Sequence, residues 1–225
     1  MTLDPKIKAV GFDMDGTVLD TKVDYEKLGR IIPDEFSTQG VPRELIDKDI
    51  EENSASNGLA WLKANRPEAY AQFDHVVGER ATAVEMEFAD QARPFPGVIE
   101  MIRDLRAGGY RTAILTRGGR EYATALLTRF GMMDLFDAVV ARDDYPYEEA
   151  KPAKEAMEHV CGKIGVGCDE IIYLGDGSAD YHTCINSGTR FIGVETHLSR
   201  SDWERIGGRS VVTIPQISDF RRYMD

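Results

Sequence analysis

From position 98 onward the chain alternates between two kinds of segment, and this alternation constrains its fold more than any other feature. Segments with apolar residues at helical spacing alternate with short apolar runs that are typical of strands, and glycines close several of the helices. The expected helices are 98–106, 120–130, 153–164 and 179–186, and the expected strands are 110–116, 136–141, 171–174, 190–194 and 210–214. Alternating strands and helices predict an α/β fold with a parallel sheet, right-handed crossovers and helices on both faces.

A separate apolar run near the beginning, 7–12, predicts a further buried strand of this sheet. The long segment that follows it shows no convincing strand pattern, and its apolar residues recur at helical spacing. The Pro-Phe-Pro-Gly sequence at 94–97 is a stiff, turn-rich connection. We therefore expect a Rossmann-like α/β core built from residues 1–21 and 93–225, interrupted by an all-helical cap domain at 22–92.

The net charge limits the partners that such a protein can take. At −12, the chain would be repelled by nucleic acid and by an anionic membrane surface, so neither is expected as a partner. A small anionic substrate is compatible with this charge, because the field of surface charges decays within ~8 Å at physiological salt. A metal ion and one or two lysines then dominate a local site.

The cysteine pattern and the first residues indicate a reducing compartment. Cys161, Cys168 and Cys184 are odd in number and lack a CxxC spacing, so neither a disulfide framework nor a zinc site is predicted. The chain begins without an apolar signal region, and no uncharged apolar run approaches the ~18 residues that span a bilayer. We expect a cytoplasmic protein without a membrane segment.

Two acidic residues, Asp13 and Asp15, directly follow the first expected strand, and Gly16 and Thr17 supply the turn that ends it. Carboxylates at the end of a buried strand are costly unless a cation or backbone N–H groups neutralise them. In an open parallel sheet, ligands bind at the carboxyl ends of the strands. The two acids therefore indicate a cation or ligand site, although on this stretch alone a helix cap or a solvent-facing turn is the open alternative.

Polar residues also follow the other expected strands at the same edge of the sheet. Thr116 follows one strand, Asp176 and Asp180 follow another, and Lys151 begins a helix. Each of these alone is typical of a cap, a turn or a loop, but together they place four acids, a hydroxyl and a lysine at one edge. The Gly-Asp-Gly sequence at 175–177 does not indicate a dinucleotide site, because Asp180 stands where a third glycine is required.

These motifs occur in a recognisable order. They are Asp-Met-Asp-Gly-Thr at 13–17, Thr116, Lys151, and Gly-Asp at 175–176 with Asp180. In this combination the chain resembles phosphatases of the haloacid dehalogenase superfamily over nearly its whole length. The helical insertion is similar to the first cap type of that family, and 94–97 resembles the return linker of its phosphoglycolate phosphatase-like branch. Two departures, Gly177 for a serine and Lys154 for a proline, do not fall on catalytic positions.

The resemblance implies roles for the acids. Asp13 would attack phosphorus, and as a carboxylate it needs no base because it is ionised at neutral pH. Asp15 would protonate the leaving alkoxide and then activate the water that hydrolyses the aspartyl-phosphate. Mg²⁺ is the implied cofactor, with Asp13, Asp176 and the backbone carbonyl of Asp15 as its ligands.

The resemblance also implies how a phosphoryl group would be held. Thr116, Lys151 and backbone N–H groups that include that of Arg117 would bind its oxygens. Asp180 would support the water shell of the metal or orient Lys151. Three further acids near this edge are interpreted as structural: Asp20, Asp143 and Asp144.

The expected function is Mg²⁺-dependent hydrolysis of a small phosphorylated metabolite, a phosphomonoester for which phosphoglycolate is the first candidate. A phosphosugar mutase of the same superfamily stays open as an alternative. A catalytically silent binding module on the same fold has less support, and so does a dehalogenase, because halide chemistry does not need Asp15 as an acid. The sequence predicts no oligomeric state.

The cap is expected to determine the substrate by closing over the core, with 19–24 and 91–97 as its linkers. Two interpretations of its polar and basic side chains stay open: one of them contacts the substrate, or all of them lie on solvated helix faces. These side chains are Arg43, Lys48, Lys63, Arg66, His75 and Arg80.

Overall fold

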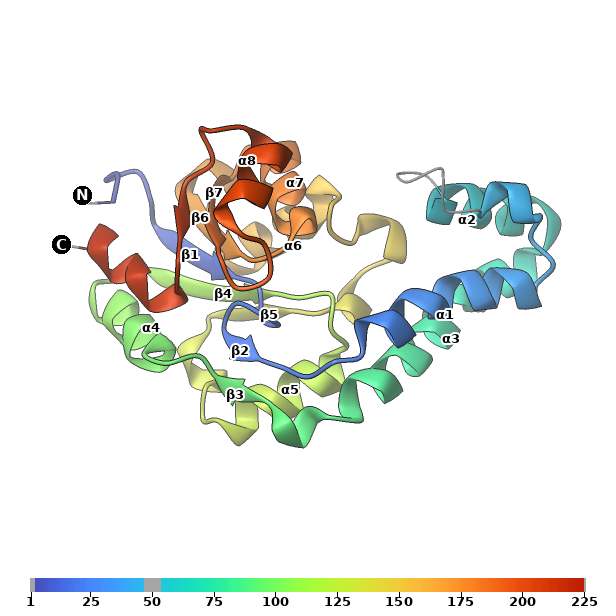
Figure 1. The fold of residues 1–225 in the computed structure, drawn as a ribbon, viewed down its shortest axis with the longest axis horizontal. Helices are drawn as coiled ribbons and strands as arrows, with labels where there is room; N and C mark the ends of the chain where they lie inside the picture. Colours follow the sequence, from blue (N-terminus) through green and yellow to red (C-terminus); the bar gives the residue numbers. More distant parts are fainter. Residues whose placement is uncertain (1–2, 47–53, 225) are drawn as a thin grey trace.

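The computed structural model describes residues 3–46 and 54–224. Its centre is a six-stranded sheet in the order β5-β4-β1-β6-β7-β8, in which neighbouring strands are parallel (Figure 1). The strands are β1 Ala9–Phe12, β4 Arg111–Leu115, β5 Ala138–Val140, β6 Ile171–Gly175, β7 Arg190–Val194 and β8 Thr213–Ile214. β1 lies between β4 and β6, so the carboxyl ends of these three strands are adjacent. The predicted α/β class with a parallel sheet is confirmed.

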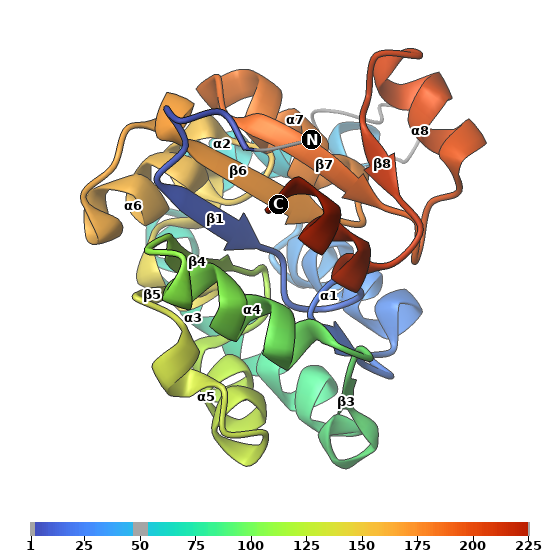
Figure 2. The ribbon, with the colours of Figure 1, turned by 90° about the vertical axis from the view of Figure 1, so that its left-hand side faces the viewer.

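Helices cover both faces of the sheet (Figure 2). They are α4 Val98–Ala107 and α5 Arg120–Arg129 on one face, and α6 Lys154–Ile164 and α7 Ser178–Ser187 on the other. Alternate residues of a strand point to opposite faces, and β1 shows this directly. Val10 and Phe12 pack in one apolar cluster with Met101 and Leu126, whereas Ala9 packs in the other with α6. A sheet that is buried on both faces needs near-continuous apolar strands, which explains why β1 and β6 contain no charged residue.

Three further helices extend from the sheet as a separate layer (Figure 1). They are α1 Tyr25–Thr38, α2 Ser54–Asn65 and α3 Pro67–Met86. They share an apolar cluster of their own, in which the rings of Phe36 and Phe73 stack with their centroids 5.2 Å apart. An antiparallel pair, β2 Leu19–Asp20 and β3 Arg93–Pro94, joins the two connections to the sheet. The described part of the expected cap segment is helical. That residues 22–92 form a domain separate from the core stays a prediction.

Short 3-10 helices complete the connections. They are η1 Arg43–Leu45, η2 Ala89–Gln91, η3 Met133–Leu135, η4 Arg142–Asp144, η5 Tyr147–Glu149, η6 Cys168–Glu170 and η7 Ile217–Tyr223. Within residues 3–46 and 54–224, no helix combines the length and the apolar character that a membrane crossing requires.

The structure differs from the expected elements mainly after position 194. The strand expected at 210–214 is only the two-residue β8, and the helix α8 Arg200–Gly207 and the 3-10 helix η7 were not predicted. α8 is short and mostly polar, and Trp203 is its only buried residue. A capping box between Ser199 and Asp202 begins this helix instead.

Candidate active site

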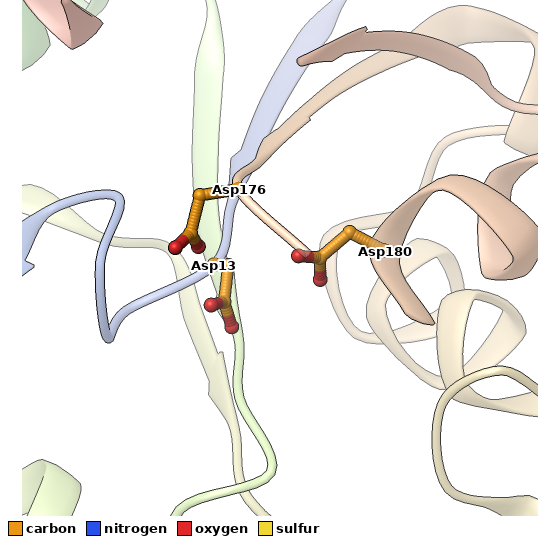
Figure 3. Close-up of side chains that lie close together, drawn as sticks. All are labelled: Asp13, Asp176 and Asp180. Atoms are coloured by element: carbon orange, nitrogen blue, oxygen red, sulfur yellow. The ribbon is translucent and has the colours of Figure 1, made fainter. Parts of the chain in front are cut away.

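The carboxyl ends of β1, β4 and β6 bring the predicted site residues together. Asp13 directly follows β1, Thr116 directly follows β4, and Asp176 directly follows β6. The register aligns Phe12 with both Ile114 and Leu174. Figure 3 shows the side chains of Asp13 and Asp176 next to each other, with that of Asp180 approaching from α7. The parallel pairing therefore brings Asp13, Thr116 and Asp176 together, and α7 adds Asp180.

Three buried carboxyl groups form a candidate metal centre. One oxygen each from Asp13, Asp176 and Asp180 lies within 4.8 Å of the others. Burial raises the pKa of Asp13 well above its ordinary value, and burial together with the charge of Asp180 raises the pKa of Asp176 to about 7. Buried carboxylates that are ionised together repel each other, and their oxygens are the ligands that Mg²⁺ prefers. The donor set therefore fits a divalent cation.

The turn after β1 supports Asp176. The hydroxyl of Thr17, which is fully buried, donates a hydrogen bond of 3.0 Å to Asp176 Oδ1. Gly16 has a φ of +76°, and a Cβ atom on it would lie 2.1 Å from Asp176 Oδ2. Only glycine adopts this conformation readily and leaves room for the carboxylate.

Lys151 lies in the middle of the acids with 5% of its surface exposed. Its Nζ donates to Asp13 Oδ1 at 2.7 Å and to Asp180 Oδ1 at 2.6 Å. Tyr173 Oη and the Leu115 carbonyl lie 3.2 Å from the same nitrogen. Burial lowers the pKa of Lys151, but the charges of Asp13 and Asp180 outweigh it, so the pKa is above its ordinary value. The ammonium group is charged and held at Asp13.

The two oxygens of Asp180 both have partners. Oδ1 accepts from Lys151, and Oδ2 accepts the backbone N–H of Gly177 at 3.0 Å in the first turn of α7. Asp180 therefore contacts Lys151 directly, while its role, in orienting Lys151 or in supporting the water shell of a metal, stays a prediction. The same carboxylate is also one of the three groups in the candidate metal centre, whereas the side chain of Asp15 is not.

Asp15 points elsewhere although only one residue separates it from Asp13. Its Oδ1 accepts a hydrogen bond of 2.7 Å from the hydroxyl of Tyr122 on α5. Burial raises the pKa of Asp15 above its ordinary value, and hydrogen bonds from Tyr122 and Thr21 partly offset that effect. A proton on this carboxyl group is therefore held more tightly than on an exposed aspartic acid.

The loop after β4 presents Thr116 and several backbone N–H groups. Thr116 is 1% exposed, and its Oγ1 accepts the backbone N–H of Gly118 at 2.9 Å, which leaves its own proton free for donation. The side chain of Arg117 is exposed, and the prediction for this residue rests on its backbone N–H. The next N–H, that of Gly119, donates to Glu85 Oε2 at 3.0 Å.

Glu85 and Arg142 connect the helical layer to the loops beside the site. Glu85 on α3 is 3% exposed and forms an ion pair with Arg142, which follows β5. Arg142 also donates to Thr82 Oγ1 at 2.8 Å and to the Gly78 carbonyl at 3.1 Å. α3 is therefore joined to two loops of the core by charged hydrogen bonds that sequence reasoning missed.

A cavity of about 980 Å³ lies between α3 and the loop 142–147. Tyr145 lines it, is 8% exposed, and stacks on His159 with ring centroids 5.1 Å apart. Within the described part of the chain, the Tyr145 hydroxyl has no hydrogen-bond partner. Burial raises its pKa, and the nearby positive charges of Lys151 and Arg117 lower it. Tyr145 thus lies between the cavity and the acids.

Other predicted residues lie away from the carboxylates. Arg43, Lys63, Arg66 and His75 are exposed, as solvated helix faces are expected to be, and Arg80 pairs with Glu35 at 3.3 Å. Lys48 lies outside the described residues. Asp20, Asp143 and Asp144 each bind a cationic side chain or a backbone N–H nearby, in keeping with structural roles. The cysteines Cys161, Cys168 and Cys184 are free.

Sequence reasoning missed Tyr122, Tyr173, Glu85, Arg142 and Tyr145. The partner of Tyr122 is 107 positions away in the sequence, and the two partners of Glu85, Gly119 and Arg142, are 34 and 57 positions away. Buried tyrosines and a lone glutamate on an apolar helix face carry no local signal for such contacts. The one available signal was a polar atom on an otherwise apolar face, because buried polar atoms normally have a hydrogen-bond partner.

Known proteins are similar to this chain in sequence and in fold. The family model of haloacid dehalogenase-like hydrolases matches residues 7–188. The phosphoglycolate phosphatase of Nitrosospira multiformis is 28% identical over 187 residues, which are 81% of this chain and 81% of its own. That of Caulobacter vibrioides is 26% identical over 211 residues, 90% of this chain and 85% of its own. In fold, the chain is similar to CbbY from Rhodobacter sphaeroides in complex with phosphate, with a TM-score of 0.60 and 21% identity. The match covers 95% of this chain and 96% of the CbbY chain.

The family match spans β1 to α7 and therefore includes all the motifs on which the resemblance rests. The resemblance is confirmed, including the similarity to phosphoglycolate phosphatases, and so is the expected enzyme class, a hydrolase with phosphatases as its relatives. The chain belongs to the haloacid dehalogenase-like hydrolases.

Proposed function

We propose that this protein hydrolyses a small phosphomonoester with Mg²⁺ through an aspartyl-phosphate on Asp13. The observation that carries the proposal is the buried lysine–aspartate pair, Lys151 Nζ to Asp13 Oδ1 at 2.7 Å, within a group of carboxylates at the carboxyl end of the sheet. The lysine ammonium beside Asp13, together with a cation held by the further acids, would supply the positive charge needed to receive a phosphate that itself carries negative charge.

Asp13 is the nucleophile in this proposal. Lys151 holds Oδ1, which leaves Oδ2 to attack phosphorus, and no base is required because the lysine and a cation favour the ionised carboxylate. Asp13 and Asp176, with the backbone carbonyl of Asp15, would hold Mg²⁺, and Thr17 would orient Asp176. When bound, Mg²⁺ supplies positive charge that offsets the repulsion between Asp13 and the phosphate oxygens.

The loop after β4 binds the phosphoryl group. The hydroxyl of Thr116 and the backbone N–H groups of Arg117, Met14 and Asp15 donate to its oxygens, and Lys151 adds a charge-assisted bond. Asp180 keeps the ammonium group of Lys151 in place through the bond of 2.6 Å.

Asp15 carries the proton. In the first step it protonates the alkoxide that leaves as Asp13 takes the phosphoryl group, and in the second step it removes a proton from the water that attacks the aspartyl-phosphate. Its raised pKa supports the first of these tasks, because the carboxyl group must hold a proton when the substrate arrives.

The proposed substrate is phosphoglycolate or a similarly small phosphate ester. Support comes from the relatives that bear the name phosphoglycolate phosphatase. We expect the helical layer to close over the acids and to limit the size of the substrate. We expect the protein to act in the cytoplasm, where such metabolites occur, without a nucleic acid or membrane as partner.

The test is release of inorganic phosphate from a panel of small phosphomonoesters by the purified protein with Mg²⁺. We expect turnover that EDTA abolishes and excess Mg²⁺ restores. Asp13→Asn should lower kcat by about a thousandfold or more, since it removes the nucleophile. Asp20→Asn is the matched control, because Asp20 pairs with Lys22 at 2.8 Å outside the site, and it should keep full activity.

Two results would contradict the proposal: no phosphate released from any ester of the panel, or full activity of Asp13→Asn. Transfer of the phosphoryl group to a second hydroxyl of a sugar phosphate, without release of phosphate, would identify the mutase alternative.

A further inference from the structure

Tyr122 on α5 is a buried tyrosine whose hydroxyl reaches a predicted catalytic group. Its side chain is 1% exposed and belongs to the apolar cluster beneath the sheet. The ring packs toward Gly118, where a Cβ atom would lie 3.0 Å from the Tyr122 ring. The hydroxyl lies 2.7 Å from Asp15 Oδ1. One side chain therefore contacts both the loop after β4 and the first motif.

Core packing alone does not explain a tyrosine at this position. A phenylalanine would fill the same space, whereas a hydroxyl in an apolar cluster costs free energy unless it finds a partner. Asp15 is that partner. Burial and the charge of Asp15 raise the pKa of Tyr122 above its ordinary value, so the phenol stays protonated and donates the hydrogen bond.

The bond determines which oxygen of Asp15 can carry a proton. Because the phenol donates to Oδ1, that oxygen acts as an acceptor, and Oδ2 is the one available to hold a proton for a leaving group. Thr21, on the connection between β2 and α1, interacts with the same carboxyl group. The hydrogen bond from Tyr122 thus fixes one oxygen of this carboxyl group from the side of the core.

We propose that Tyr122 is a positioning residue for acid catalysis: its hydroxyl fixes the carboxyl group of Asp15 so that Oδ2 points to the leaving oxygen of the substrate. The inference rests on the proposed phosphatase function. In the step concerned, the bond between phosphorus and the ester oxygen breaks, the electron pair stays on that oxygen, and the proton passes to it from Asp15. Tyr122 keeps its own proton throughout.

The test is Tyr122→Phe, which keeps the ring and removes only the hydroxyl. Wild type and variant are assayed with Mg²⁺ on phosphoglycolate, whose alkoxide needs a proton to leave, and on p-nitrophenyl phosphate, whose nitrophenolate leaves without one. The ratio kcat/KM reports transition-state stabilisation relative to the free enzyme. We expect kcat/KM to fall about tenfold for phosphoglycolate, because the variant loses one hydrogen bond to the acid. The value for p-nitrophenyl phosphate should change by less than about twofold, because that leaving group does not use the proton.

The difference between the losses of kcat/KM on the two substrates distinguishes a role of Tyr122 in positioning Asp15 from a role in folding. Both kcat/KM values come from one preparation, so their ratio does not depend on the fraction of folded protein. Tyr181→Phe is the control, since Tyr181 lies on α7 with its ring against Phe191, and it should leave the ratio unchanged. Equal losses on both substrates, or an unchanged ratio in Tyr122→Phe, would overturn the proposal. A wild type that releases no phosphate from any ester of the panel would overturn the phosphatase function and this inference with it.

A double-mutant cycle gives a second measurement. If Tyr122 acts only through Asp15, then Tyr122→Phe has no further effect on phosphoglycolate hydrolysis in the Asp15→Asn background. A further tenfold loss in that background would show that the hydroxyl acts elsewhere and would overturn the assignment.

Discussion

At the residue scale, small differences in orientation separate the acids of the first motif. Asp13 and Asp15 are two positions apart, yet the first is bound by Lys151 and the second by Tyr122. The turn at Gly16, which follows them, leaves space for the carboxylate of Asp176. Each carboxylate thus has a distinct partner before any ligand binds, which suits the separate tasks proposed for them.

The same scale gives a prediction for Thr17. Thr17→Val keeps the volume and removes the hydroxyl that donates to Asp176 at 3.0 Å. Groups that orient metal ligands typically change metal affinity 10- to 100-fold, so the Mg²⁺ concentration for half-maximal phosphatase activity should rise at least about tenfold. Thr183→Val is the control, because Thr183 is also fully buried but donates to the Ala179 carbonyl on α7. An equal rise in both variants would contradict the prediction.

At the element scale, α3 and the loops after β4 and β5 meet through Glu85 and Arg142. Glu85 accepts from Gly119 in the core and pairs with Arg142, whose side chain is 13% exposed. An ion pair at this depth contributes little net stability, but removal of one partner leaves the other charge buried and uncompensated. The pair therefore favours the observed position of α3 against the core more than it stabilises either part alone.

The prediction at this scale concerns Glu85→Gln. We expect the free energy of unfolding to fall by about 3 kcal/mol, because the Arg142 charge loses its buried partner and keeps only the more exposed Asp143 at 3.5 Å. We also expect faster hydrogen exchange at the Gly119 amide. Glu35→Gln is the matched control, since Glu35 pairs with Arg80 inside the helical layer. Unchanged exchange at Gly119 in Glu85→Gln, or the same acceleration in Glu35→Gln, would show that the pair does not hold α3 to the core.

At the scale of the whole molecule, the site accumulates negative charge inside a chain of net charge −12. Burial and Asp180 raise the pKa of Asp176 from 3.8 to about 7. The folded state therefore binds this proton more tightly than the unfolded state does. In metal-free protein, that contribution to stability is complete below about pH 4 and is lost as the pH rises to about 7.

Mg²⁺ should compensate for this loss. At a metal concentration about a hundred times Kd, binding stabilises the folded state by about 2.7 kcal/mol. We expect the rise in unfolding temperature on addition of Mg²⁺ to be larger at pH 8 than at pH 6, where protons compete for Asp176. Calorimetry with Mg²⁺ or EDTA measures it, and Asp176→Asn should remove most of the rise. An equal rise at both pH values would contradict the prediction.

The sequence by itself determined the sheet, the helical insertion and the set of acids at one edge. Asp13, Thr116 and Asp176 could be placed together because each directly follows a strand, and parallel strands bring their carboxyl ends to the same edge whatever the details of packing. The motif order then identified the family. α8 was not predicted, because it is short and mostly polar and Trp203 is its only buried residue, whereas β8 is a shorter version of the strand predicted at 210–214.

Only the tertiary structure decided which groups surround those acids. The contacts of Tyr122 with Asp15 and of Glu85 with Gly119 and Arg142 depend on how α5 and α3 pack, and no local pattern encodes a partner dozens of positions away. Backbone hydrogen bonds align the strands of a parallel sheet whatever their side chains are, whereas side-chain contacts between layers depend on the shape of every packed neighbour. The acids of this site could therefore be placed from the strand ends, while the tyrosine and the ion pair that lie beside them could not.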